Sequence, residues 1–135
     1  MANGTIAFDT LQTSGQITGT AKSLDTDYVV NGVPKVWISL NGTSFGIRDS
    51  FGISSADDDG SGDYGINFSS NFDTANYCVN QCASYDGGGG GAFGRYLSAP
   101  QGNILSSEIE FIATYDYNQS QDCEWAMLQI VGDLA

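Results

Sequence analysis

The stretch SSADDDGSGDYGINFSS, residues 54–70, decides how this chain folds. Its second half alternates, so that Tyr64, Ile66 and Phe68 fall on one face of an extended chain and polar residues or glycine on the other. Such alternation is typical of a half-buried β-strand. The Asp- and Gly-rich run before it has the residues that a tight turn requires. We therefore predict a hairpin whose turn, residues 57–62, joins a strand that contains Ile53 to the strand that contains Tyr64.

The same stretch is close to the pattern of a calcium-binding loop. Asp57, Asp59, Ser61 and Gly62 fill the first, third, fifth and sixth positions of D-x-[DN]-x-[DN]-G. The twelfth position, where a bidentate glutamate belongs, is Phe68, and strand patterns flank the loop where helices should be. We therefore interpret the aspartates as turn residues and expect no metal site and no cofactor. In the alternative, a calcium site of another kind, the candidate ligands are Asp57, Asp59 and Asp63.

Outward from this hairpin, most of the chain alternates in the same way. KVWISLNG (residues 35–42), SFGIRDSFGIS (44–54) and EIEFIATYDY (108–117) each place apolar residues on one face. CEWAMLQIV (123–131) is apolar on both faces, which indicates a central strand or one at an interface. Short strands separated by turn signals such as Asn31-Gly32 and Asn41-Gly42 predict an all-β fold. We expect an antiparallel β-sandwich, jelly-roll-like, over residues 33–135.

Residues 1–32 have a different composition, rich in Thr, Ser and Gly. They are too polar for a core layer and too apolar for a plain linker. We predict an extended N-terminal attachment arm that buries its isolated apolar residues against another chain, and the alternative is a disordered tail. The residues expected to mediate this assembly are Ile6, Phe8, Leu11 and Ile17.

A second candidate contact region is SYDGGGGGAFGRY, residues 84–96, which contains five consecutive glycines. The simpler interpretation is a flexible loop tip. The alternative is a surface loop that presents aromatic side chains to a ligand, since binding residues concentrate on loops. The candidate recognition residues are Tyr85, Phe93 and Tyr96.

Composition limits the function. The chain has 4 basic residues, 16 acidic residues and no histidine, with a net charge of −12. This charge opposes binding to nucleic acid or an anionic membrane, because those partners require basic residues. Without histidine there is no standard nucleophile–base pair, so we predict that the chain is not an enzyme. Glu108 and Glu110 would share one strand face; a paired-carboxylate glycosidase is the alternative to a solvated face.

The cysteines and the first residues suggest where the chain is made. Cys78, Cys82 and Cys123 cannot all pair within the chain, and we expect them to be reduced and mostly buried. The beginning, MANGTIAFDT, has neither a basic nor an apolar signal region. No stretch reaches the length of a membrane span, so we expect no membrane insertion. We expect synthesis in a cytoplasm without a signal peptide.

Two stretches resemble a known family: GTIAFDTLQTSGQITGTAKSLDTDYVVNG with KVWISLNGT, and IRDSFGISSADDDGSGDYGINFSSNFDTANYCV. Both are similar to virion fibre and adhesin domains of tailed phages, notably marine and cyanobacterial ones. The resemblance covers roughly residues 4–80, departs from the family at Asp57–Gly60, where Thr-Asp-Asn-Gly is usual, and does not extend beyond residue 83. The matching positions are Lys35–Trp37, Asn41–Thr43, Ile47, Arg48, Ser50, Phe51, Ser54, Ser55, Gly60, Gly62–Tyr64 and Ala75–Tyr77.

The resemblance implies a structural protein of a phage particle, made in the host cytoplasm and located in the virion. It implies a homotrimer that contacts other virion proteins. The function we expect is that of a fibre or adhesin-type component that contacts a host surface glycan or protein. The alternative is a capsid decoration or cement protein that stabilises the shell.

Overall fold

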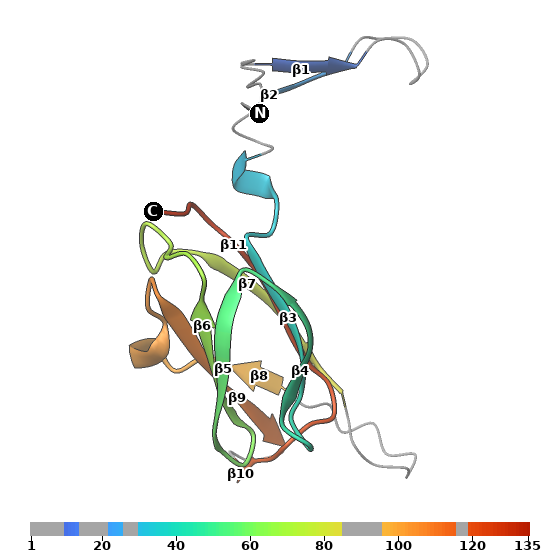
Figure 1. Cartoon of the computed structure of the whole chain (residues 1–135), viewed down its shortest axis with the longest axis vertical. Helices are drawn as coiled ribbons and strands as arrows, with labels where there is room; N and C mark the ends of the chain where they lie inside the picture. The colour runs from blue at the N-terminus through green and yellow to red at the C-terminus, as the bar shows by residue number, and fades with distance from the viewer. Residues whose placement is uncertain (1–9, 14–21, 26–29, 85–95, 116–118) are drawn as a thin grey trace, which may run out of the picture. The chain divides into compact units, whose positions relative to one another are not determined.

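The computed structural model describes residues 10–13, 22–25, 30–84, 96–115 and 119–135 (Figure 1). The chain divides into two units, residues 1–33 and 34–135. In the first unit, β1 (Thr10–Thr13) and β2 (Lys22–Asp25) form an antiparallel pair with Thr10 opposite Asp25, and residues 30–32 are helical. The segment expected to be an extended arm therefore contains a short two-stranded hairpin.

The second unit confirms the predicted all-β antiparallel sandwich. One sheet has the order β10–β9–β6–β5, with β8 also paired to β9, and the other has the order β4–β3–β11–β7. A single turn of 3-10 helix, η1 (Gln101–Asn103), precedes β9. The strands are β3 (Val36–Asn41), β4 (Gly46–Phe51), β5 (Ile53–Gly60), β6 (Asp63–Phe68), β7 (Cys78–Ala83), β8 (Tyr96–Ser98), β9 (Glu108–Tyr115), β10 (Gln119–Ser120) and β11 (Ala126–Val131).

The predicted hairpin is confirmed, but its turn is shorter than expected. β5 and β6 pair antiparallel with Ile53 opposite Phe68, and only Ser61 and Gly62 lie between the strands. Gly60 and Gly62 have φ values of 147° and 70°, which allow the chain to reverse over so few residues. The three aspartates 57–59 therefore belong to β5 and not to the turn. Because β5 is the outer strand of its sheet, these carboxylates are exposed.

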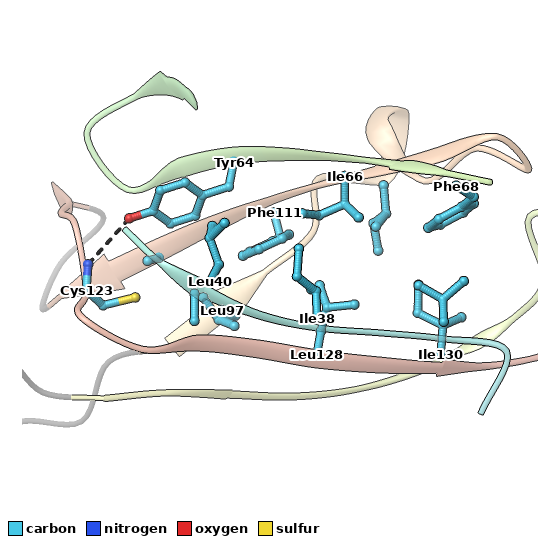
Figure 2. Close-up of a cluster of buried hydrophobic side chains, with 14 of the residues drawn as sticks. Ile38, Leu40, Tyr64, Ile66, Phe68, Leu97, Phe111, Cys123, Leu128 and Ile130 are labelled. Atoms are coloured by element: carbon cyan, nitrogen blue, oxygen red, sulfur yellow. Dashed lines mark hydrogen bonds between the residues drawn. The ribbon is translucent and has the colours of Figure 1, made fainter. Parts of the chain in front are cut away.

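The core lies between the two sheets, where their inward faces meet. Figure 2 shows Tyr64, Ile66, Phe68 and Phe111 of one sheet and Ile38, Leu40, Leu128 and Ile130 of the other in a single cluster. Each of these side chains belongs to the alternation of its own strand, and burying one contributes about 1.5–3 kcal/mol. Further buried members of the cluster are Val36, Phe72, Leu97, Ile109, Ala113, Cys123 and Ala126.

Strand β11 has the central position predicted for CEWAMLQIV, between β3 and β7. Its inward residues Ala126, Leu128 and Ile130 are buried in the core. Its outward residues include Met127, which is half-buried, and Gln129, which is exposed. The two-sided apolar pattern therefore comes from a core face and a partly covered outward face. No helix in the described part of the chain is long and apolar enough to span a bilayer.

Candidate functional site

The outward face of the four-stranded sheet carries aromatic and amide side chains in one row across the strands. In the register, Trp37 of β3 lies opposite Phe51 of β4 on one side and Gln129 of β11 on the other, and Gln129 lies opposite Asn80 of β7. Trp37 is 36% exposed and Phe51 59% exposed. With neighbouring strands about 4.8 Å apart, the row of four residues is about 14 Å long.

A hollow of about 430 Å³ lies over this face, and we call it the Trp37 groove. Ile38 and Leu128 of the core form part of its lining. None of the described residues that line it is charged. The outward residues in its lining are Trp37, Ser39, Asn80, Cys82, Met127 and Gln129, together with Gln81 of the edge strand.

The edge strand beside the groove is held in place by a side-chain contact between the sheets. Gln81 of β7 donates a hydrogen bond from its side-chain amide to the carbonyl oxygen of Leu97 in β8. Because β8 pairs with β9, this bond ties the edge strand of one sheet to the other sheet. At the groove itself, the hydroxyl of Ser39 is enclosed and makes no hydrogen bond to a described residue. The amide of Asn80, one residue before Gln81, is exposed.

A second tryptophan, just before β11, is covered by a cation. The guanidinium carbon of Arg48 lies 3.8 Å from the ring centroid of Trp125. The same guanidinium donates to the carbonyl oxygen of Glu124 at 3.1 Å and lies 3.5 Å from its carboxylate. A cation over an indole ring is attracted by the electrons of that ring. Trp125 is thus as exposed as Trp37, at 39%, but it already has a stacking partner.

The outward face of the five-stranded sheet is acidic. A hollow of about 270 Å³ is lined by Asp57 and Asp59 of β5 and by Glu108 and Glu110 of β9, with Gly65 of β6 between them. In the register, Gly65 lies opposite Asp57 on one side and Glu110 on the other. The residue between the two acidic strands thus has no side chain, which leaves the hollow open. The side-chain amide of Asn67 donates to Asp57 at 2.7 Å and partly offsets the charge.

Two carboxylates on this face, Glu110 and Asp63, have a raised pKa. Burial raises the pKa of Glu110, and the negative charges of Asp63, Asp59 and Glu108 raise it further. Burial and the charge of Asp59 also raise the pKa of Asp63, one oxygen of which is enclosed without a hydrogen bond from a described residue. The face is thus a set of mutually repelling acids. No group of three or more Asp, Glu or Cys among the described residues has an arrangement that could hold a metal ion.

Burial and charge repulsion together make stability depend on pH in a defined direction. The pKa values of Glu110 and Asp63 are raised in the folded protein, so the folded state binds their protons more tightly than the unfolded state does. Stability is then gained as the pH falls through the raised pKa values and lost as it rises through them. We expect the melting temperature to increase from pH 7 toward about pH 5.

Two matched variants test whether the acidic face causes this pH dependence of the melting temperature. Glu110→Gln removes one charge from the acidic face and should reduce the pH-dependent gain. Asp133→Asn removes one charge just after β11, a strand of the other sheet, and should preserve the gain. Thermal melts followed by circular dichroism at several pH values measure both. A melting temperature that falls steadily on acidification, or an unchanged pH dependence in Glu110→Gln, would contradict the repulsion.

The structure places the sequence-predicted candidates in different regions. Asp57, Asp59 and Asp63 all lie in the acidic sheet, on the two strands of the hairpin, β5 and β6. Tyr96 begins β8 and is 68% exposed. Leu11 lies in β1. The remaining candidates, Ile6, Phe8, Ile17, Tyr85 and Phe93, lie outside the described residues.

One expectation about the cysteines is wrong. All three thiols are free, but only Cys123 is buried, and Cys78 and Cys82 are exposed. Both lie on β7, the edge strand of the four-stranded sheet, and Cys82 lines the Trp37 groove. Because they are four positions apart along the strand, they share its outward face, which the core does not cover. Free cysteines are buried on average, but that average does not apply to a thiol on the outward face of an edge strand.

Sequence reasoning did not identify the Trp37 groove. The available signal was the residue pattern of KVWISL, which places Trp37 with Lys35 and Ser39 on the face opposite the apolar residues. A large aromatic residue on the solvent side of a strand indicates a binding site more strongly than one on the core side, where burial already explains it. Comparison of the chain with protein-family models, with curated proteins and with solved structures gives no match.

Proposed function

We propose that this chain is a structural virion protein of a tailed phage, a fibre or adhesin-type component that contacts the host surface. The Trp37 groove is the observation that carries this proposal. It is an uncharged, partly aromatic surface on a protein with a net charge of −12. Exposed patches of this kind on a soluble domain mark interaction sites. The resemblance of residues 4–80 to phage fibre and adhesin domains supports the same function.

In this proposal the two units have separate tasks. The unit of residues 1–33 attaches the chain to other virion proteins, and the sandwich is displayed. Every member of the buried core cluster lies between Val36 and Ile130, which is consistent with a sandwich that keeps its own core when the arm is engaged elsewhere. The protein is made in the host cytoplasm and carried on the virion. It acts by binding and has no catalytic role.

A capsid decoration or cement protein is the second candidate, and the β1–β2 hairpin is compatible with it. Among the described residues this hairpin pairs with no third strand. An open strand edge can add to a sheet of another protein by main-chain hydrogen bonds. Such an attachment would suit a protein that fastens onto a shell as well as one that fastens onto a fibre.

We predict that the full chain is a homotrimer assembled through its arm. Light scattering after size exclusion should give three times the chain mass of 14.2 kDa. Deletion of residues 1–32 should give a folded monomer, because the described members of the core cluster, Val36 to Ile130, all remain after the deletion. A monomeric full chain at micromolar concentration would contradict the prediction. Loss of the folded state on deletion would show that the arm belongs to the core.

The adhesin function is tested by binding to host cells. Fluorescently labelled full chain should bind cells of the phage host, and excess unlabelled chain should lower the adsorption rate of the phage. The control is the same cells with a mutation that makes them resistant to adsorption, which should bind little protein. Equal binding to susceptible and resistant cells, or unchanged phage adsorption in the presence of saturating chain, would contradict the function.

A further inference from the structure

We propose that the Trp37 groove binds an uncharged oligosaccharide of the host surface. This inference rests on the proposed adhesin function and specifies the chemistry of its ligand. It draws on three features of the groove: the indole ring of Trp37, the amide groups and the lack of charge in the lining.

The aromatic and amide side chains of the groove suit the two kinds of surface that a sugar has. A pyranose ring has a face of C–H bonds, which packs against an aromatic ring, and an edge of hydroxyl groups, each both donor and acceptor. Trp37 provides an exposed aromatic ring in the groove, and Phe51, opposite it in the register but outside the lining, provides a second ring beside it. Gln129 and Asn80 follow in the same row. Their amides each offer two donors and an acceptor, which is what hydroxyl groups require.

The charge of the groove and of the whole chain selects among ligands. None of the described residues in the lining is charged, so the groove has no cation to pair with a uronate, sulfate or phosphate. The net charge of −12 also repels an anionic polymer at long range. A neutral oligosaccharide experiences neither penalty.

The amide groups of the groove disfavour a second copy of this chain as the occupant. Packing an apolar protein surface on the groove would remove water from the amides of Asn80 and Gln129 without replacing their hydrogen bonds, which is unfavourable. A ligand rich in hydroxyl groups replaces the water that it displaces.

The dimensions of the groove favour several sugar units over one. The part of the row that lines the groove, from Trp37 to Asn80, is about 10 Å long, and the hollow has a volume of about 430 Å³. Its floor is held by sheet pairing on both sides of β11 and by the bond from Gln81 to Leu97. An open groove of this kind gives weak binding per site. Several copies on one particle raise the overall affinity by 10²–10⁴, roughly, if they engage together.

The first test separates glycan receptors from protein receptors on cells. Host cells are treated either with periodate, which cleaves the vicinal diols of sugars, or with a protease, and then incubated with labelled full chain. We expect binding to be lost after periodate and kept after protease. The reverse result would overturn the inference while leaving the adhesin function intact. No binding to untreated cells would count against the adhesin function itself.

The second test determines whether the glycan binds in the groove. The neutral probes are hexasaccharides of glucose, galactose, mannose and N-acetylglucosamine, and the anionic probe is a galacturonate hexasaccharide. Titration calorimetry with the full chain should detect binding of a neutral probe and none of galacturonate. Trp37→Ala should weaken that binding about thirtyfold, as expected for a central aromatic contact. Gln129→Ala should weaken it about tenfold.

Trp125→Ala is the matched control, because it removes an equally exposed tryptophan that Arg48 already covers. It should change the affinity less than about threefold. Circular dichroism melts confirm that each variant is folded. Three results would overturn the inference: no neutral probe binds, Trp125→Ala weakens binding as much as Trp37→Ala does, or Trp37→Ala changes the oligomeric mass and not the glycan affinity. The last result would identify the groove as an interface between copies.

Discussion

Tyr64→Ala is expected to lower the free energy of unfolding by about 3–5 kcal/mol, the cost of removing a large aromatic side chain from a core. Tyr64 is fully buried. Its ring centroid lies 5.6 Å from that of Phe111 and 6.4 Å from that of Phe45. Its hydroxyl lies 3.3 Å from a carboxylate oxygen of Asp122 and accepts a bond from the backbone amide of Cys123 at 3.4 Å. The side chain therefore joins the predicted hairpin to the core and to the segment before β11.

Tyr64→Phe separates the ring from the hydroxyl. It keeps the packing and loses only the two polar contacts of the hydroxyl, so we expect a loss of about 1 kcal/mol. Urea unfolding of the two variants and the parent chain, followed by circular dichroism, gives the comparison. Equal losses in both variants would show that the hydroxyl and not the ring provides the stability. A loss below about 1 kcal/mol in Tyr64→Ala would mean that the ring is not in the core.

Gly62→Ala is expected to destabilise the fold by about 3 kcal/mol or more, because two separate penalties act at this turn. Gly62 has a φ of 70°, which residues with a Cβ atom rarely adopt. A Cβ atom there would lie 2.6 Å from the backbone nitrogen of Gln121 and 2.8 Å from the carbonyl oxygen of Ala113. Backbone atoms cannot move aside as a flexible side chain can. The backbone of Gly62 is also fixed at both ends, by a 2.6 Å bond to Asp122 and a 2.6 Å bond from Ala113.

Gly102→Ala is the matched control for this turn. No atom lies within 4 Å of the position its Cβ atom would take, so we expect a change within about 0.5 kcal/mol. Urea unfolding measures both glycine variants under the same conditions. A Gly62→Ala variant as stable as Gly102→Ala would contradict the close packing of the turn against β9 and residue 121.

The strands could be predicted because the face of each strand that packs in the core requires apolar residues at every second position. Val36, Ile38 and Leu40 repeat every second residue, as do Ile109, Phe111 and Ala113, and both sets are buried. The turn of the hairpin was harder to place. Asp residues favour turns but are equally stable on an exposed edge strand, so composition alone does not decide between residues 57–62 and residues 61–62. The conformations of Gly60 and Gly62 decide it, and Gly62 is held by hydrogen bonds to Asp122 and Ala113, which lie far away in the sequence.

The candidate site could be predicted less well than the fold. Glu108 and Glu110 were expected on one strand face, but their meeting with Asp57 and Asp59 depends on β6 lying between β5 and β9. Likewise, Trp37, Gln129 and Asn80 are widely separated in the sequence and form one row only through the order β3–β11–β7. Strand order depends on long-range pairing, which leaves no local pattern in the sequence. The sequence shows that Trp37 lies on the solvent face of its strand, but it does not show which residues of other strands lie beside it.

The location of this chain on the phage particle tests the proposed function most directly. A cryo-electron-microscopy map of the intact virion would place the sandwich by its two sheets of four and five strands. We expect trimeric copies on a tail fibre or its tip, with the groove over Trp37 facing away from the particle. Copies arrayed over the capsid shell, or a groove buried against another virion protein, would contradict the adhesin function and favour the decoration role.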